Sequence, residues 1–126
     1  MKHILIVDDN KTNLIMARQE LKEEYEVTPV ISGEQALQFL EKRIPDLILL
    51  DINMPVMDGK ETLTRIKENP VWSNIPVIFL TAKDDKESVM KVVSLKPEKY
   101  LLKSMSKEKL TGAIDDFFIS KANRKR

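Results

Sequence analysis

Five short apolar runs, separated by stretches with helical spacing, constrain the fold of this chain more than any other feature. Three of them, Ile4–Val7, Leu47–Leu50 and Val77–Leu80, are rich in Val, Ile and Leu, which is typical of parallel strands buried on both faces. Weaker strands are predicted at Glu26–Val30 and Tyr100–Leu102. Strands that alternate with helices predict right-handed crossovers, and therefore a doubly wound α/β fold with five parallel strands, (βα)5, and helices on both faces.

The helical stretches have one apolar face and recognisable ends. The last helix is the clearest, because its apolar residues follow the spacing i, i+3, i+4, i+7, i+8: Leu110, Ala113, Ile114, Phe117 and Phe118. We expect Asn10 to cap the first helix and Ser32 to start the second, since both side chains can accept a hydrogen bond from the first turn. The third helix is expected to stop near Asn69-Pro70.

Polar residues follow four of the apolar runs at the point where each strand is predicted to end. Asp8 and Asp9 follow the first run and Asp51 the third, while Thr81 and Lys103 follow the last two. The carboxyl ends of parallel strands form the crevice in which open α/β sheets bind ligands. Three carboxylates placed together repel one another, and a hard divalent cation removes that conflict. The sequence therefore predicts an Mg²⁺ and phosphoryl site.

The same residues suit phosphoryl transfer onto a carboxylate. An aspartate can act as the nucleophile and give an acyl phosphate, while the metal and Lys103 would neutralise charge on the incoming group. Thr81 could then donate a hydrogen bond to a phosphoryl oxygen, and the small Ala82 leaves room for that oxygen.

Composition limits the other possibilities. The chain has 126 residues, 42% of them hydrophobic, which suits one domain, expected at residues 1–120 and followed by a basic tail at 121–126. The formal net charge of +1 argues against nucleic acid or membrane as a partner. No cysteine is present, and three glycines cannot form a GxGxxG turn or a Walker loop. We expect a soluble, cytoplasmic domain.

Taken together, these motifs resemble one protein family. The chain is similar to the receiver domains of response regulators in two-component phosphorelays, of the stand-alone single-domain type, which have a flavodoxin-like fold. The resemblance extends from Ile4 to Phe118. The residues that carry it are Asp8-Asp9, Asp51, Met54-Pro55, Asp58-Gly59, Thr81-Ala82, Tyr100 and Lys103.

The resemblance implies a role for each residue of the site. Asp51 corresponds to the phosphoacceptor. The ligands implied for Mg²⁺ are the side chains of Asp8, Asp9 and Asp51 and the backbone carbonyl of Asn53. The residues implied for phosphoryl binding and for the conformational switch are Thr81, Ala82, Lys103 and Tyr100.

The function implied is a phosphorylation-dependent signalling switch in signal transduction. A sensor histidine kinase or a histidine phosphotransfer protein would supply the phosphoryl group. The domain would catalyse only its own phosphorylation and dephosphorylation, and would not turn over small substrates. A downstream protein would then bind the face formed by the fourth helix, the fifth strand and the fifth helix, near Met90, Lys91, Tyr100 and Lys107.

Two departures from the family pattern bear on the site. Family members usually have a proline on a cis bond after the lysine, whereas Ser104 follows Lys103 here. A non-proline cis bond costs about 3 kcal/mol, so either the site holds that strain or the bond is trans and Lys103 sits differently. Lys96-Pro97 replaces the usual Gly-Ala. Lysine is a poor left-handed cap and a residue before proline favours extended geometry, so we expect a short or irregular fourth helix.

Two other functions remain open from the residues alone. A receiver-like interaction module that works without phosphate would fold normally but would not be modified at Asp51. An aspartate-nucleophile phosphohydrolase matches Asp51 superficially, but such an enzyme needs a second acid two residues later. Asn53 occupies that position and cannot transfer protons.

Overall fold

The computed structural model describes residues 1–82 and 85–124. Five parallel strands form one sheet in the order β2-β1-β3-β4-β5. The strands are β1 (His3–Val7), β2 (Glu26–Val30), β3 (Leu47–Asp51), β4 (Val77–Thr81) and β5 (Lys99–Leu102). The predicted doubly wound, flavodoxin-like (βα)5 fold is confirmed.

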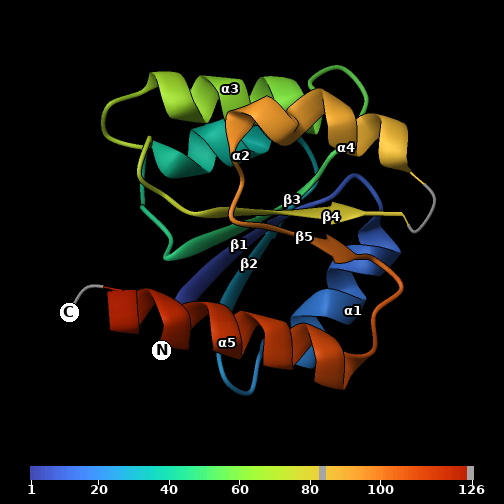
Figure 1. Cartoon of the computed structure of the whole chain (residues 1–126), viewed down its shortest axis with the longest axis vertical. Helices are drawn as coiled ribbons and strands as arrows, with labels where there is room; N and C mark the ends of the chain where they lie inside the picture. Colours follow the sequence, from blue (N-terminus) through green and yellow to red (C-terminus); the bar gives the residue numbers. More distant parts are fainter. Residues whose placement is uncertain (83–84, 125–126) are drawn as a thin grey trace.

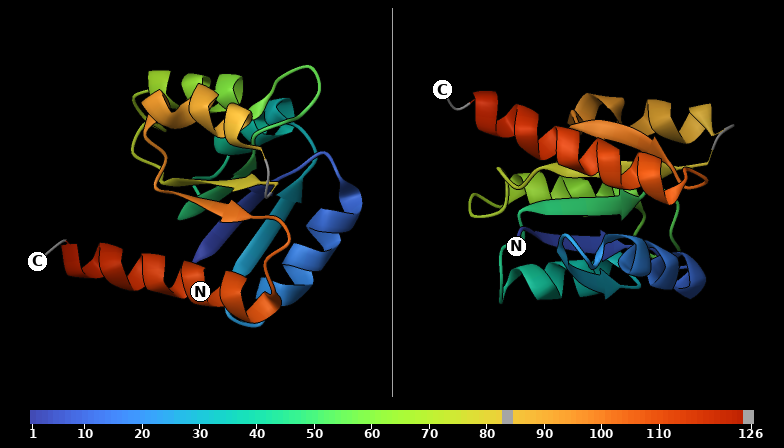
Figure 2. Two further views of the ribbon diagram at one scale, coloured as in Figure 1. Left: turned by 45° about the vertical axis from the view of Figure 1, so that its right-hand side comes forward. Right: turned by 90° about the horizontal axis from the view of Figure 1, so that it is seen from below.

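Helices cover both faces of the sheet, as the alternating pattern predicted (Figure 1). The helices are α1 (Lys11–Leu21), α2 (Gly33–Leu40), α3 (Gly59–Glu68), α4 (Lys86–Val92) and α5 (Lys107–Arg124). Helices α2, α3 and α4 lie on one face, and α1 and α5 lie on the other. The left view of Figure 2 shows the carboxyl end of α5 extending past the edge of the sheet where the strands begin.

The apolar strands divide their side chains between two cores. In β1, Leu5 and Val7 pack in the core under α2, α3 and α4, whereas Ile4 and Ile6 pack against α1 and α5. All five residues of β1, β3 and β4 are buried, so alternation places large apolar side chains on both faces. The continuous apolar runs in the sequence follow from this double burial.

Polar caps fix where the first two helices begin. The side chain of Asn10 accepts a hydrogen bond from the backbone N–H of Asn13 (3.0 Å), and Ser32 Oγ accepts one from Gln35 (3.1 Å). Both predicted helix starts are confirmed. The predicted end of α3 is also confirmed, since Asn69 is its C-cap.

The connection between β4 and β5 agrees with one expectation and contradicts another. Helix α4 has only seven residues and continues into a 3₁₀ turn at Val93–Leu95, so the predicted short fourth helix is confirmed. Lys96, however, is not extended; it adopts φ 54° and ψ 58°, the left-handed geometry that a glycine cap would take. The N–H of Lys96 donates to the Val93 carbonyl (3.2 Å) and closes the turn, which outweighs the preference imposed by the following proline.

Helix α5 continues into the segment that composition set apart as a tail. The helix runs to Arg124, so residue 121 marks a change in composition and not the end of an element; residues 125–126 lie outside the described part. Within residues 1–82 and 85–124, every helix is too short or too polar to cross a bilayer.

Candidate phosphoacceptor and metal site

Strand register brings the three predicted carboxylates together. Strand β3 pairs with β1 through Leu50 and Val7, so Asp51 and Asp8 follow neighbouring positions at the same edge of the sheet. Oxygen atoms of Asp8, Asp9 and Asp51 all lie within 4.8 Å of one another. Asp8 and Asp51 are 1% and 2% exposed, whereas Asp9 is open to solvent. The site is therefore a buried carboxylate pair with a third carboxylate at its mouth.

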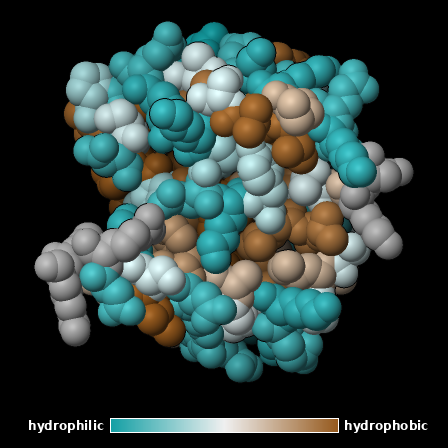
Figure 3. Space-filling model, viewed as in Figure 1, coloured by the Kyte–Doolittle hydropathy of each residue, from teal (hydrophilic) through white to brown (hydrophobic). Residues whose placement is uncertain are grey.

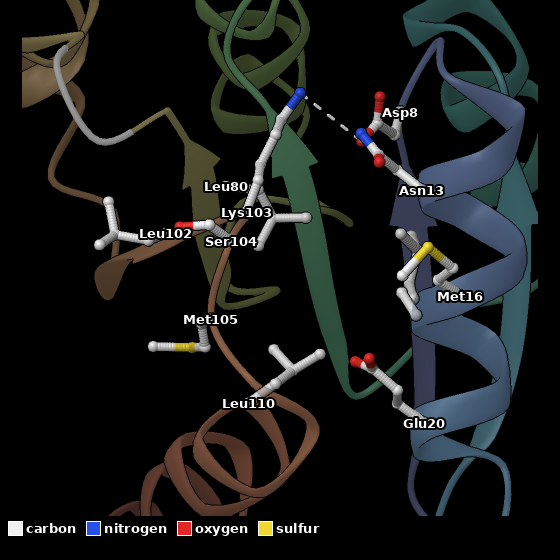
Figure 4. Close-up of a pocket in the computed structure, with 12 residues that line it drawn as sticks. Asp8, Asn13, Met16, Glu20, Leu80, Leu102, Lys103, Ser104, Met105 and Leu110 are labelled. Atoms are coloured by element: carbon white, nitrogen blue, oxygen red, sulfur yellow. Dashed lines mark hydrogen bonds and ion pairs between the residues drawn. The ribbon is translucent and has the colours of Figure 1, made fainter.

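Lys103 reaches this cluster from the end of β5. Its Nζ lies 3.0 Å from Asp51 Oδ2 and 3.6 Å from Asp8 Oδ2; the contact with Asp8 is drawn in Figure 4. The backbone N–H of Lys103 donates to the Thr81 carbonyl (2.9 Å), which fixes this end of β5 beside β4. No peptide bond in the described ranges is cis. Ser104 therefore follows a trans bond, and the ammonium group still reaches both carboxylates.

Burial and charge act in opposite directions on the phosphoacceptor candidate. Burial raises the pKa of Asp51 to about 6, and the negative charge of Asp8 adds to this, while Lys103 and the Asn53 N–H act to lower it. Burial also lowers the pKa of Lys103, but the contact with Asp51 and the charges of Asp8 and Asp9 outweigh it, so the net shift is upward. Burial thus disfavours the charged form of Asp51, and the ammonium group of Lys103 partly offsets this effect.

The donor set fits a hard divalent cation. All candidate ligands are oxygen atoms, which Mg²⁺ prefers. Asp51 Oδ2 is fully buried and accepts no hydrogen bond in the part of the chain that is described; only the ion pair with Lys103 compensates it. The Asn53 N–H donates to Asp51 Oδ1 (3.3 Å), which brings the loop after β3 back towards the site. Asp8, Asp9, Asp51 and the Asn53 carbonyl would hold the ion.

Two of the predicted switch residues, Thr81 and Tyr100, lie on the neighbouring strands β4 and β5. Thr81 is buried, and its hydroxyl donates to the carbonyl of Ala82 (3.2 Å), which is itself exposed. The Tyr100 ring stacks on Phe79, with centroids 6.0 Å apart. The Tyr100 hydroxyl is buried without a hydrogen-bond partner among the described residues, and burial raises its pKa.

Asn13 belongs to the site but was given no role by the sequence reasoning. Its Nδ2 donates to Asp8 Oδ2 (3.3 Å), and the backbone N–H of Asn10 donates to Asp8 Oδ1 (3.0 Å). Both oxygens of this buried carboxylate are therefore oriented by the N-cap and the first turn of α1. The signal was available, because a polar side chain at the third position of a helix can reach back past the N-cap.

Asp85, the N-cap of α4, and Ser88, in its first turn, were also missed. Asn53 Nδ2 donates to Asp85 Oδ2 (2.5 Å), and Asn53 Oδ1 accepts from Ser88 Oγ (3.2 Å). The other oxygen of Asp85 caps α4 by accepting from the Ser88 N–H (3.2 Å). The Asp-x-x-Ser spacing indicates a helix cap, but nothing local in the sequence links that cap to residue 53.

The loop between β3 and α3 is held close to the phosphoacceptor by Gly59. The Gly59 N–H donates to the Ile52 carbonyl (2.7 Å), and a Cβ at this position would lie 2.5 Å from the Asp51 carbonyl oxygen. At the tip of the loop, Val56 has φ 67° and is 92% exposed. Only glycine allows the start of α3 to approach the end of β3 this closely.

The chain is similar to known proteins in both sequence and fold. The family model for the response regulator receiver domain matches residues 4–115. The chain is 33% identical to the response regulator Rcp1 of Synechocystis, covering 94% of this chain and 89% of that protein. It is 42% identical over 103 residues to a probable cyclic di-GMP phosphodiesterase of Vibrio cholerae, covering 82% of this chain but only 23% of that protein.

Solved structures agree. The chemotaxis protein CheY4 of Vibrio cholerae superimposes with a TM-score of 0.84 at 27% identity, covering 92% of this chain and 98% of that one. The chain also spans only 12% and 18% of two other curated relatives, in which the matched region is one part of a longer protein. Because the family model covers most of the chain, this protein belongs to the response regulator receiver domains of two-component signalling.

Proposed function

We propose that this protein is a phosphorylation-dependent switch that accepts a phosphoryl group on Asp51. One observation carries the proposal: the ammonium group of Lys103 lies 3.0 Å from a buried Asp51 carboxylate, beside two further carboxylates that suit Mg²⁺. A buried carboxylate with a raised pKa and a specific charge partner in a crevice is typical of a reactive group.

The reaction is a displacement at phosphorus. An Asp51 carboxylate oxygen attacks the phosphorus of a phosphohistidine, the O–P bond forms, and the P–N bond breaks with the electron pair going to the imidazole, which takes a proton from water. Mg²⁺, when bound, neutralises charge on the phosphoryl oxygens. Lys103 contributes a second positive charge, and Asn13 keeps Asp8 oriented through its hydrogen bond. The domain thereby catalyses its own modification and is not a turnover enzyme.

The surface next to the site suits a protein donor. A cavity of about 180 Å³ extends from Asp8 and Lys103 between α1 and the start of α5. Figure 4 shows Met16 on one side of it and Met105 and Leu110 on the other. An apolar side chain from a sensor histidine kinase or a histidine phosphotransfer protein could enter this cavity while its phosphohistidine approaches Asp51.

The surface beyond the switch residues suits a downstream partner. Thr81 and Leu102 line a largely apolar cavity of about 260 Å³ together with Val89 and Met90 of α4. Met90 and Leu102 are also exposed, and hydrophobic side chains gather on this side of the molecule in Figure 3. We propose that the face formed by α4, β5 and α5 is the output surface. Thr81, at the end of β4, lies between Asp51 and this face, and Tyr100 lies on β5 within it, so the two residues could bias two states of the face.

Beryllofluoride, which imitates a phosphoryl group on a carboxylate, tests this proposal. Backbone amide resonances would be recorded with Mg²⁺ alone and with Mg²⁺ plus beryllofluoride. We expect shifts at Thr81 and Ala82 that continue through α4 and around Tyr100. Shifts confined to the immediate surroundings of Asp51 would contradict an output face at α4, β5 and α5. The Asp51→Asn variant, which lacks the acceptor carboxylate, should show no shifts.

A further inference from the structure

From the side-chain network between the β3–α3 loop and α4, we infer that Asp85 and Ser88 are positioning residues for the Mg²⁺ site. They act through Asn53, whose backbone carbonyl is one of the proposed ligands. The inference rests on the metal site of the proposed function. It adds that the first turn of α4 forms part of the outer shell of that site, although no residue of α4 is itself proposed to bind the ion.

The side chain of Asn53 is held at both ends of its amide group. Nδ2 donates to Asp85 Oδ2 (2.5 Å), and Oδ1 accepts from Ser88 Oγ (3.2 Å). On the backbone side, the Asn53 N–H donates to Asp51 Oδ1 (3.3 Å). One residue therefore connects the phosphoacceptor to the start of α4 through three hydrogen bonds.

Asp85 uses separate oxygens for two tasks. Oδ1 caps α4 through the Ser88 N–H, whereas Oδ2 receives the hydrogen bond from Asn53. The two functions can therefore be separated by mutation. A serine at position 85 can still cap the helix with one oxygen, but it has no second acceptor for Asn53.

The link matters for metal binding because outer-shell hydrogen bonds orient ligands. Losing such a partner typically lowers metal affinity about 10–100-fold. Asn53 lies in an exposed loop, so without Asp85 and Ser88 its peptide unit would sample more orientations, and ordering it would cost free energy when the ion binds. Asp8 has no such dependence on α4, since Asn10 and Asn13 hold it. Asp51 is held by Lys103 in addition to the Asn53 N–H.

Thermodynamic reciprocity extends the inference to α4. If the link between Asn53 and α4 strengthens Mg²⁺ binding, then Mg²⁺ must stabilise the link by the same factor. Helix α4 has seven residues, of which only Ser88 and Val92 are buried. Such a short helix has few packing contacts, so its first turn should respond measurably to the ion.

The test compares Mg²⁺ affinities, measured by calorimetric titration without any phosphoryl donor. We expect Asp85→Ser and Ser88→Ala each to raise the dissociation constant about ten-fold. Ser88→Thr keeps the hydroxyl and should restore an affinity close to that of the wild type. Ser94→Ala, an exposed change in the 3₁₀ turn after α4, should bind like the wild type.

A second readout follows α4 itself. Hydrogen exchange of the amides from Ser88 to Val92 should slow when Mg²⁺ is added to the wild type and should change much less in Asp85→Ser. Equal Mg²⁺ affinities for the wild type, Asp85→Ser and Ser88→Ala would overturn the inference and leave the proposed function intact. A wild type that binds no Mg²⁺ would instead remove the metal site, and the inference with it.

Discussion

Burial disfavours the charged form of Asp51, and this makes the stability of the folded protein depend on pH. Its pKa is raised by burial from 3.8 to about 6, so the unfolded chain gives up this proton at a lower pH than the folded protein. The stability associated with the protonated carboxyl is fully present below pH 3.8 and is lost as the pH rises through about 6. At neutral pH without Mg²⁺, ionised Asp51 therefore destabilises the fold.

The Asp51→Asn substitution should raise the free energy of unfolding at pH 7 in EDTA by about 2 kcal/mol, because it removes this unfavourable charge. The gain should shrink towards pH 4, where the wild-type carboxyl is protonated. Urea unfolding followed by Trp72 fluorescence would measure both values. Asp116→Asn, at an exposed position, is the matched control and should leave the stability unchanged; a similar gain there would point to net charge and not to burial.

The Tyr100 hydroxyl also costs stability, since no group in the described part of the protein forms a hydrogen bond with it. The group is buried without a hydrogen-bond partner among the described residues, so removing it relieves a desolvation cost of about 1–2 kcal/mol. We expect Tyr100→Phe to be as stable as the wild type or up to about 1 kcal/mol more stable. Thermal unfolding would check this, and a loss of stability would show that the hydroxyl is bonded in solution.

The sequence correctly predicted the positions of side chains that directly follow the end of a strand. Asp8, Asp9, Asp51 and Lys103 come together because parallel strands all present their carboxyl ends at one edge. The link from Asn53 to Asp85 and Ser88 could not be foreseen in this way. It depends on how the β3–α3 loop turns relative to α4, and no short-range pattern encodes that relation.

At the level of elements, α3 begins so close to the end of β3 that position 59 should not accept a residue with a side chain. In Gly59→Ala the new Cβ would lie 2.5 Å from the Asp51 carbonyl oxygen and 2.7 Å from Ile52 Cα. Both are backbone atoms and cannot move aside cheaply, so we expect a loss of about 2–3 kcal/mol. Gly112→Ala, where a Cβ meets no atom within 4 Å, should be neutral or slightly stabilising. Chemical denaturation of the two variants would compare them.

Introducing a glycine should stabilise the protein at Lys96, the cap of the 3₁₀ turn that follows α4. Lys96 holds a left-handed conformation that disfavours a Cβ by about 1 kcal/mol, so Lys96→Gly should stabilise the protein by about 0.5–1 kcal/mol. Lys91→Gly makes the same change inside α4, where it should destabilise by about 1 kcal/mol. Equal effects of the two substitutions, measured by urea unfolding, would contradict this account of the cap.

Predictions of helices and strands were also correct where the sequence carries a local signature and wrong where the surrounding fold decides the geometry. Strands and helix starts could be predicted because burial on both faces and polar caps each leave a local signature, as at Ile4–Val7 and Asn10. The geometry of Lys96 was predicted wrongly. The preference set by the following proline is local, whereas the closing of the 3₁₀ turn and the path into β5 are set by the surrounding fold.

At the scale of the whole molecule, fold and family follow from the sequence, while the coupling between parts does not. The order β2-β1-β3-β4-β5 places Asp8 and Asp51 next to each other at the centre of the sheet, with Thr81 and Lys103 on the side towards the proposed output face. Under the proposed function, a signal at Asp51 would have two routes to α4: one through Thr81 and β5, and one through Asn53. The second route is visible only in three dimensions.

The central claim is that Asp51 accepts a phosphoryl group in an Mg²⁺-dependent reaction, although Ser104 follows Lys103. The most direct test is the intact mass of the protein after incubation with acetyl phosphate and Mg²⁺, beside the Asp51→Asn variant and a sample containing EDTA. We predict one phosphoryl adduct on the wild type alone, absent from both controls. An unmodified wild type, also after incubation with a phosphohistidine donor, would contradict the account and favour a receiver-like interaction module that works without phosphate.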